Sequence, residues 1–384
     1  MEGIVVIIVV YVLLYCGYIV ALSHGFTKVK AFKAIGSVPV TTFSIIIPFR
    51  NEEQNLKRLL DSIAALDYPT EKFELLFVDD FSEDFSVNVI NKWRIQNGKI
   101  QTTLLENLRL SASPKKDAIS RAVPVIENQW IITTDADCIV PQNWLTTFNN
   151  YILGNDVDMI AAPVAYDGKM SFLHHFQRLD MLSLQGVTIG SFGIGNPFMC
   201  NGANFAYTKK CYSELGGFAG NTTVASGDDV FLLQKAVLKD KSRVHYLKSN
   251  GAVVKSKPVD SWSQLLQQRI RWGSKTSDYN TNFGIELALV TFLGNFAIVL
   301  LALLAVFEII DWRIAAGLFV IKSVPDFILL VQTNGFLIGG RLFFPFFSAV
   351  LYPFFCVMVV LAAVFGKYEW KGRKYKKATA VSRL

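Results

Sequence analysis

Long apolar runs near both ends of the chain constrain its fold more than any other feature. Residues 4–22 carry no charge, and at about 1.5 Å per residue they can cross a hydrocarbon core of roughly 30 Å. Basic residues follow this run and do not precede it, so the sequence predicts a retained transmembrane anchor over residues 1–24 and not a cleaved leader. Since positive residues stay inside, we expect an integral protein of the plasma (inner) membrane whose next segment faces the cytoplasm.

Three further apolar segments lie in the last quarter of the chain. Residues 287–307 and 342–365 each have the length and composition of a span. The segment between them, 314–331, contains Lys322 and Asp326, and charges at membrane depth are costly. It either crosses with these two side chains paired, four residues apart, or it is re-entrant or interfacial. The sequence therefore predicts a C-terminal membrane region with two or three spans.

The expected membrane region comprises residues 283–365. The net charge of +7 comes largely from the tail that follows it. Residues 366–384 hold seven basic residues and one acidic residue. A polybasic stretch beside an apolar run is typical of a segment near anionic lipid, and an ordinary solvated tail fits equally well. If only two C-terminal segments cross, this tail lies in the cytoplasm, which the positive-inside rule favours. The rest of the chain is nearly neutral, so nucleic acid is not an expected partner.

The middle of the chain, residues 40–275, alternates short β-rich runs with segments of helical period. Strands separated by helices predict right-handed βαβ units, and hence an α/β domain with a mostly parallel sheet and helices on both faces. In such a sheet, ligands bind at the carboxyl ends of the strands. The expected strands are 43–48, 74–78, 101–105 and 130–134, and the expected helices are 52–66, 84–97 and 115–126.

Polar or acidic side chains follow three of these strands, so we expect them at one edge of the sheet. They occur in residues 48–52, in residues 79–80, and at Asp135 and Asp137. Asp135 and Asp137 are two residues apart, and alternate residues of an extended segment point to the same side. Two such carboxylates suit Mg²⁺, which takes one or two carboxylates together with substrate phosphates. The alternative is a solvated turn.

Asp228 and Asp229 open a predicted helix, where acids complement the helix dipole. The functional interpretation is a general base that takes a proton from an attacking hydroxyl, its pKa raised towards the working pH by the neighbouring like charge. Lys115 and Lys116 lie at another helix start, where basic side chains suit the dipole only if they meet an anion. A solvated surface pair is the alternative for these lysines.

Gln268, Arg271 and Trp272 fall on one face of a predicted helix. A guanidinium forks onto phosphate oxygens, and an indole offers a flat apolar surface to a sugar ring. An amphipathic helix among lipid headgroups is the alternative. Residues 174–190 have the pattern of a second interfacial helix, which favours an acceptor in the membrane.

In their order along the chain, these motifs resemble those of membrane-bound glycosyltransferase family 2 enzymes, which have the nucleotide-sugar-binding GT-A fold. The Q-x-x-R-W element is similar to that of cellulose, chitin and hyaluronan synthases and of ceramide glucosyltransferase. The resemblance covers about residues 42–275. The motifs are P-F-R-N-E at 48–52, V-D-D-x-S at 78–82, T-D-A-D at 134–137, G-A-N at 202–204, G-D-D-x-x-L-L at 227–233 and Q-R-I-R-W at 268–272.

The resemblance implies a role for each matching residue. Asp229 would be the general base, with Asp228 beside it where Glu is more common. Asp135 and Asp137 would hold a divalent metal, Mg²⁺ or Mn²⁺, on the donor diphosphate. Arg50 stands where an aromatic residue often lies against the base, which leaves the nucleotide open. The residues expected to bind the donor are Pro48, Arg50, Glu52, Asp79, Asp80, Lys115, Asp135, Gln268 and Arg271, and those expected to bind the acceptor are Gly202, Ala203, Asn204 and Trp272.

The resemblance thus implies an inverting transfer from a nucleotide-diphosphate sugar, most simply a UDP-sugar, to a lipid or lipid-linked glycan in the membrane. A processive polysaccharide synthase is the main alternative, although about three C-terminal spans suit a self-contained channel poorly. A membrane-anchored nucleotide-sugar-binding protein without catalysis is the alternative from another class, and the intact set of acids disfavours it.

Overall fold

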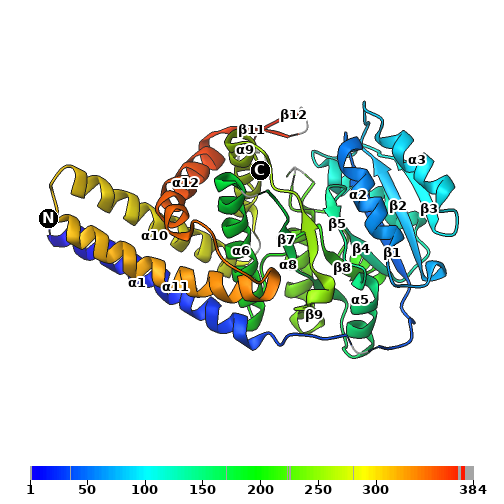
Figure 1. Ribbon diagram of the computed structural model, residues 1–384, viewed down its shortest axis with the longest axis horizontal. Coiled ribbons are helices and arrows are strands. Elements are labelled where there is room, and N and C mark those ends of the chain that lie inside the picture. The colour runs from blue at the N-terminus through cyan, green and yellow to red at the C-terminus, as the bar shows by residue number, and fades with distance from the viewer. Residues whose placement is uncertain are drawn as a thin grey trace.

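The computed structural model describes residues 2–34, 36–169, 171–222, 224, 226–279, 281–370 and 373–376. An α/β domain and a group of long apolar helices make up the chain, and the helices extend from one end of the domain (Figure 1). The last part of the basic tail, residues 377–384, lies outside the described residues.

Seven strands form the central sheet, in the order β3-β2-β1-β4-β8-β6-β9. Neighbouring strands are parallel except at β8, which runs antiparallel to both β4 and β6. The mostly parallel sheet expected from the sequence is therefore confirmed. Its strands are β1 (Phe43–Phe49), β2 (Phe73–Asp79), β3 (Gln101–Glu106), β4 (Trp130–Thr133), β6 (Met159–Ala161), β8 (Phe205–Thr208) and β9 (Val244–Tyr246).

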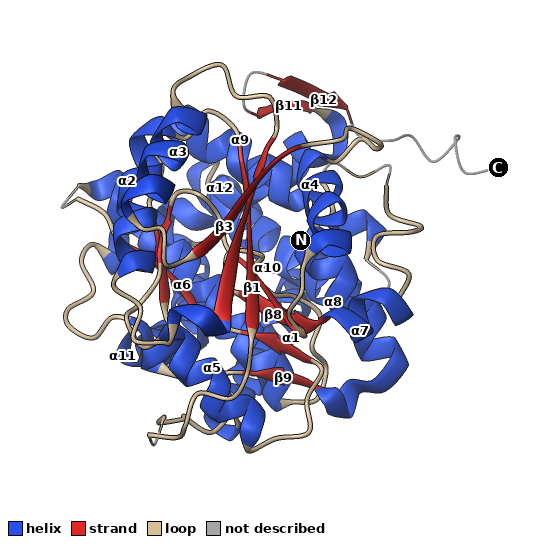
Figure 2. Cartoon of the chain, turned by 90° about the vertical axis from the view of Figure 1, so that its right-hand side faces the viewer, coloured by secondary structure: helices blue, strands red, loops and turns tan. Residues whose placement is uncertain are grey.

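Helices cover both faces of this sheet (Figure 2). Ile45 and Ile47 of β1 join one buried cluster and Ile46 joins another, because successive side chains of a strand point to opposite faces. Helix α2 packs Leu56 into the first cluster and α4 packs Ile119 into the second. Burial on both faces explains why β1 is apolar except at Ser44. The helices are α2 (Glu53–Ala64), α3 (Ser86–Gln96), α4 (Pro114–Ala122), α5 (Trp144–Leu153), α7 (Lys209–Glu214) and α8 (Asp228–Asp240).

A smaller sheet and two further helices, α6 and α9, complete the domain towards the long apolar helices. The sheet has the strand order β5-β10-β7, and β10 pairs antiparallel with β5 and parallel with β7. The elements are β5 (Cys138–Ile139), β7 (Val164–Tyr166), β10 (Val254–Ser256), α6 (Phe172–Gly193) and α9 (Trp262–Gly273).

Four helices are long and apolar enough to cross a membrane: α1 (Glu2–Lys28), α10 (Asn282–Val306), α11 (Trp312–Leu337) and α12 (Pro345–Phe365). Helices α1, α10 and α11 extend together away from the α/β domain (Figure 1). Among them, Lys322 and Asp326 form an ion pair at 2.8 Å, which is the pairing that a crossing of this segment requires. Tyr15 donates a hydrogen bond to Asp326 at 2.6 Å, and Lys322 donates one to Asn295 at 3.0 Å. This polar cluster therefore joins all three helices.

Helix α12 does not extend away from the α/β domain together with α1, α10 and α11 (Figure 1). Phe344, just before it, contacts Phe172 of α6 with ring centroids 5.8 Å apart. Near its end, Ala363 packs against Ile270 of α9. Both ends of α12 therefore meet the α/β domain, although its length and composition would allow a span.

The chain beyond α12 returns to the α/β domain. Strands β11 (Lys367–Trp370) and β12 (Arg373–Lys376) pair as a short hairpin, and Arg373 forms an ion pair with Asp80 at 2.5 Å. The described part of the tail thus lies on the domain's side. This is the arrangement expected when two of the three C-terminal segments cross.

Helices α1 and α6 cross so closely that the contact requires glycine. A Cβ on Gly193 would lie 1.8 Å from the carbonyl oxygen of Gly25, and one on Gly190 would lie 2.3 Å from that of Leu22. Small residues let two helix backbones approach in this way at membrane crossings. The crossing fixes the α/β domain to the first membrane helix.

Candidate functional site

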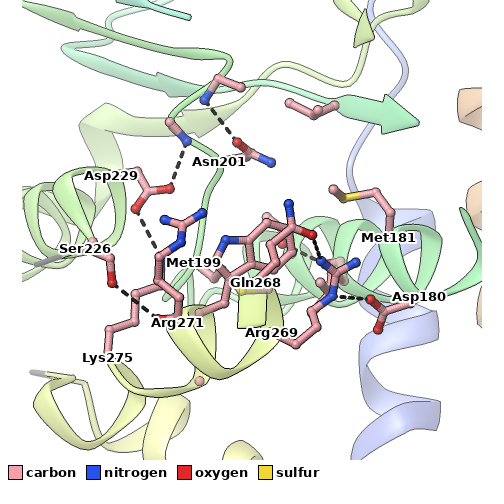
Figure 3. Close-up of a pocket in the computed structure, with 18 of the residues that line it drawn as sticks. Asp180, Met181, Met199, Asn201, Ser226, Asp229, Gln268, Arg269, Arg271 and Lys275 are labelled. Atoms are coloured by element: carbon pink, nitrogen blue, oxygen red, sulfur yellow. Dashed lines mark hydrogen bonds and ion pairs between the residues drawn. The ribbon is translucent and has the colours of Figure 1, made fainter. Parts of the chain in front are cut away.

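A cavity of about 350 Å³ lies at the carboxyl end of β4, between the α/β domain and α12 (Figure 3). This is the edge of the sheet where the topology predicts ligand binding. The residues in its wall come from motifs far apart in the sequence, so the fold brings them together. Those singled out from the sequence are Lys115, Asp135, Asp137, Gly202, Ala203, Asp228, Asp229, Gln268, Arg271 and Trp272.

The first pair of acids, Asp135 and Asp137, enters the cavity directly after β4. Asp135 forms an ion pair with Lys115 at 2.6 Å. Among the residues that the structure describes, no group of three or more His, Cys, Asp or Glu side chains could hold a metal. Two carboxylates suit Mg²⁺ or Mn²⁺ when phosphate oxygens and waters complete the coordination, so the pair fits a metal that is shared with a substrate.

The second pair of acids lies at the first turn of α8. Asp229 accepts a hydrogen bond from the backbone N–H of Gly202 at 2.8 Å and lies 3.4 Å from Lys275 Nζ. Gly227, just before the helix, has a φ of 86°, a conformation that favours glycine. A Cβ on Gly202 would lie 2.9 Å from a carboxylate oxygen of Asp228, so the close approach of these two segments also favours glycine.

Asp228 and Asp229 differ in their tendency to ionise. Burial raises the pKa of Asp228, although Lys115 lies 3.4 Å away. Burial also opposes ionisation of Asp229, but Lys275 and Lys115 outweigh it and hold the pKa of Asp229 below its ordinary value. The sequence predicts a raised pKa within this pair without deciding which acid titrates, and in the structure the raised pKa belongs to Asp228. The surrounding lysines thus favour the ionised form of Asp229 more strongly than that of Asp228.

Helix α9 presents Gln268, Arg271 and Trp272 to the cavity, as their shared helical face predicts. Arg269, to which no motif assigned a role, is buried beside them. It forms an ion pair with Asp180 of α6 at 2.6 Å (Figure 3). Its guanidinium lies 4.2 Å from the centroid of the Trp272 ring. The sequence offered only weak signals for this pair. Arg269 is a second arginine inside the Q-R-I-R-W motif, and Asp180 is an acid in a largely apolar helix.

Lys115 and Lys116 do not form the pair that the sequence predicted, either at an anion or in solvent. Lys115 lines the cavity, but Lys116 does not face an anion or solvent. It is fully buried and donates hydrogen bonds to the carbonyl oxygens of Asn221 at 2.6 Å and Val224 at 2.9 Å. Lys275, which follows the Q-R-I-R-W motif and belongs to no pattern, instead supplies the second cation near the acids.

Five residues expected to bind the donor lie at the ends of β1 and β2, beside the cavity and not in its wall: Pro48, Arg50, Glu52, Asp79 and Asp80. Arg50 donates a hydrogen bond to the backbone carbonyl of Asp80 at 2.8 Å. The carboxylate of Asp80 accepts a hydrogen bond from Asn107 at 2.8 Å besides its ion pair with Arg373. The chain's own donors therefore already bind this carboxylate.

Asn204 does not reach the cavity, unlike its neighbours Gly202 and Ala203. Its buried side chain accepts a hydrogen bond from the Trp144 indole at 3.0 Å and donates to the backbone carbonyls of Pro163 at 2.8 Å and Ala252 at 2.7 Å. The amide thus braces the loop that carries Gly202, and the structure gives it no contact with the acceptor side.

A second cavity, of about 720 Å³, lies among α1, α6, α10, α11 and α12 and adjoins the first. Asp180, Met199 and Tyr352 are among the residues that line both. The remaining charged side chains in the described wall of the second cavity are the paired Lys322 and Asp326, and most of that wall is apolar. The polar cavity therefore continues into an apolar one between the membrane helices.

Comparison with known proteins gives matches to one enzyme family. Residues 44–216 match Glycosyl transferase family 2. The chain is similar to glycosyltransferase AglE of Haloferax volcanii, with 25% identity over 123 residues that cover 32% of this chain and 39% of the relative. It is also similar to beta-monoglucosyldiacylglycerol synthase of Trichormus variabilis, with 26% identity over 110 residues, 29% of this chain and 23% of the relative. The matched segments thus span less than half the length of these relatives.

The fold extends the likeness over nearly the whole chain. The solved mannosyltransferase PcManGT of Pyrobaculum calidifontis, in complex with GDP-Man and Mn²⁺, superposes with a TM-score of 0.60 and covers 94% of this chain and 99% of its own. The sequences are 16% identical, so this likeness concerns the fold. Together with the family match over residues 44–216, it leads to one conclusion: this part of the chain is similar to glycosyl transferase family 2, and the chain has the GT-A fold.

Proposed function

We propose that the protein is a membrane-anchored, inverting glycosyltransferase that moves a sugar from a nucleoside-diphosphate donor to a lipid or lipid-linked acceptor. The observation that carries this proposal is the meeting of Asp137, Asp229 and Arg271 in the wall of one cavity. A metal-binding carboxylate, a base and a cation for the leaving group are the parts that an in-line sugar transfer uses.

The donor diphosphate would lie between the Asp135–Asp137 pair and α9. A divalent ion held by these two carboxylates would offset the charge of the diphosphate. Gln268 and Arg271 face the same space from α9, where a guanidinium can bind phosphate oxygens through two hydrogen bonds. Arg271 would therefore stabilise the charge that grows on the leaving group.

Asp229 would act as the base, because Lys275 and Lys115 keep its carboxylate ionised. It takes the proton of the acceptor hydroxyl while that oxygen attacks the anomeric carbon from the face opposite the diphosphate. The bond from the anomeric carbon to the phosphate oxygen breaks as the new bond forms. One such displacement converts an α-linked donor into a β-linked product.

The acceptor would reach Asp229 from the membrane. The apolar cavity between the membrane helices adjoins the catalytic cavity, and its wall suits lipid chains better than the hydroxyl-rich strand of a polysaccharide. The similarity to a monoglucosyldiacylglycerol synthase supports the same acceptor class. These observations favour a lipid acceptor over the processive polysaccharide synthase.

The catalytic domain would face the cytoplasm. Helix α1 ends at Lys28, and Lys30 and Lys33 follow it on the side of the α/β domain, as the positive-inside rule requires. The tail hairpin returns to the same side through Arg373.

A transfer assay tests the proposal. Membranes that contain the full chain are incubated with Mn²⁺ and a panel of labelled UDP- and GDP-sugars, and the lipids are then extracted. We expect label from one donor in the organic phase, and loss of that label with Asp229→Asn or a metal chelator. A ladder of lengthening water-soluble product would support the polysaccharide synthase instead, and no consumption of any donor would overturn the enzyme assignment.

A further inference from the structure

Within the catalytic cavity, cationic side chains are already paired with carboxylates of the chain. Arg269 lies 2.6 Å from Asp180 and Lys275 lies 3.4 Å from Asp229, and the Lys115 pair described above makes a third. These cations are therefore matched before any substrate arrives. The pairs lie on both the donor side and the membrane side of the cavity.

Over the whole wall, carboxylates exceed cations. Among the described residues that line the cavity, five aspartates face four basic side chains. A donor diphosphate brings about two negative charges, which one divalent ion offsets, so the loaded donor leaves this balance unchanged. An anionic acceptor would thus enter a space with surplus negative charge. Asp180 is buried in this wall, where a dielectric lower than that of water strengthens the repulsion of an anion.

The proposed base, Asp229, also disfavours an anionic acceptor. A hydroxyl is a weak nucleophile until a base removes its proton, whereas a phosphate monoester is largely ionised at neutral pH and needs no base. Asp229 is held ionised and faces the cavity, so it would assist a hydroxyl and repel a phosphate. The charge of the wall and the ionised base therefore select the same chemistry.

We propose that the acceptor is an uncharged lipid with a free hydroxyl, and not a lipid phosphate. This inference rests on the proposed function, because it names the acceptor of the same site. The lipid chains occupy the apolar cavity, where Lys322 and Asp326 neutralise each other at 2.8 Å. The headgroup passes Asp180, which lines both cavities, and brings its hydroxyl to Asp229.

Fractionated membrane lipids test the inference. Lipids of the host membrane are separated by anion exchange into uncharged and anionic fractions, and each fraction is mixed into phosphatidylcholine vesicles with the purified full chain, Mn²⁺ and the active labelled donor. We expect the uncharged fraction to accept label at least about tenfold better, which corresponds to about 1.4 kcal/mol of discrimination. The labelled lipid should not bind an anion exchanger and should resist mild acid, as a glycoside does and a glycosyl phosphate does not.

Other outcomes distinguish a failure of this inference from a failure of the proposed function. Equal or preferential labelling of the anionic fraction, or an acid-labile anionic product, overturns the inference while the glycosyltransferase stands. Donor hydrolysis without label in either lipid fraction overturns the lipid acceptor as well. No consumption of donor overturns the proposed function itself.

A substitution in the cavity wall tests whether its charge causes the preference for uncharged lipids. Asp180→Asn leaves Arg269 without its carboxylate and gives the membrane side of the cavity a surplus cation. We expect the preference for the uncharged fraction to fall severalfold, with polyprenyl phosphate becoming an inhibitor. The matched control is Asp156→Asn, which removes an exposed carboxylate bound to Arg243 and should leave the preference unchanged. An unchanged preference in Asp180→Asn contradicts the electrostatic account.

Discussion

The two walls of the catalytic cavity are built by different means. The donor wall consists of short polar segments that follow β4 and open α8, and ion pairs such as Lys115–Asp135 hold it in shape. The membrane wall consists of α6, α9 and α12, which pack through apolar side chains such as Phe176 and Phe355, with ring centroids 5.2 Å apart. The comparison suggests a division of labour, in which the donor wall sets the chemistry and the membrane wall sets the acceptor.

Helix α9 belongs to both walls. Gln268 and Arg271 face the cavity, while Leu265 and Ile270 pack against α12. Helix α12 therefore supports α9 from the membrane side, while the residues that would hold the leaving group face the donor side.

The largest effect is expected for Asp229→Asn in the donor wall. The amide cannot take the proton of a hydroxyl, so transfer should fall by about 10²–10⁴-fold. Binding of the donor, measured by titration with the unlabelled nucleotide sugar, should change little. Asp228→Asn should cost less, because the raised pKa of Asp228 makes it the weaker candidate for an ionised base. If Asp228→Asn is the more damaging change, the assignment of the two acids is reversed.

Much of the donor wall was predictable, because strand ends are local features. The run before Asp135 marked a buried strand, and a parallel sheet sends all such ends to one edge. The membrane wall was harder to predict, since α12 has the same apolar composition as an ordinary span. Its position against the α/β domain depends on contacts with segments far away in the chain, such as Phe344 with Phe172.

Other details of the site also depend on distant contacts and not on local sequence. Asn204 matched a loop motif, but the partners of its amide, such as Trp144, lie in a helix that the motif does not include. Lys116 has the same helix position as Lys115, and a difference of one residue turns it away from the cavity and into the core. Lys275 lowers the pKa of Asp229, yet nothing in its local sequence marks it. Sequence patterns located the site, and tertiary contacts decided which atoms face it.

The next largest effect is expected for Gly193→Leu at the crossing of α6 with α1. A Cβ there would overlap the backbone of Gly25, and backbone cannot yield as a flexible side chain does. We expect a loss of about 3 kcal/mol or more in stability and little active protein, since overpacking of this kind forces the helices apart. Thermal unfolding of the purified chain in detergent measures it. Gly17→Leu is the control, because a Cβ on Gly17 meets nothing within 4 Å.

A smaller effect, confined to the acceptor, is expected for Phe355→Ala. The ring of Phe355 packs against Phe176 and near Leu265, so its loss leaves a gap beside α9 and the route from the membrane. The KM for the lipid should rise about tenfold while the KM for the donor stays nearly constant, because a small misplacement of a positioning element costs one to two orders of magnitude. Phe354→Ala, an exposed neighbour, serves as control. Equal changes in both KM values would contradict separate roles for the two walls.

The smallest effect concerns Lys116, a buried cation behind the donor wall. Burial lowers its pKa to about 8, and the carbonyl oxygens of Asn221 and Val224 are its hydrogen-bond partners. Between about pH 8 and pH 10 the unfolded chain, where a lysine pKa is about 10.4, keeps a proton that the folded chain has released. The contribution of Lys116 to stability should therefore rise with pH across this window.

The measurement compares the wild type with Lys116→Met, which keeps the length of the side chain and removes the titration. The difference in Tm between the two should be constant below about pH 8 and should shift in favour of the wild type between about pH 8 and pH 10. Lys210→Met, at an exposed lysine, should show no such shift. Parallel pH profiles for wild type and Lys116→Met would mean that Lys116 stays protonated in the fold, and that two backbone carbonyls hold a buried cation as effectively as the carboxylates of the cavity hold Lys115.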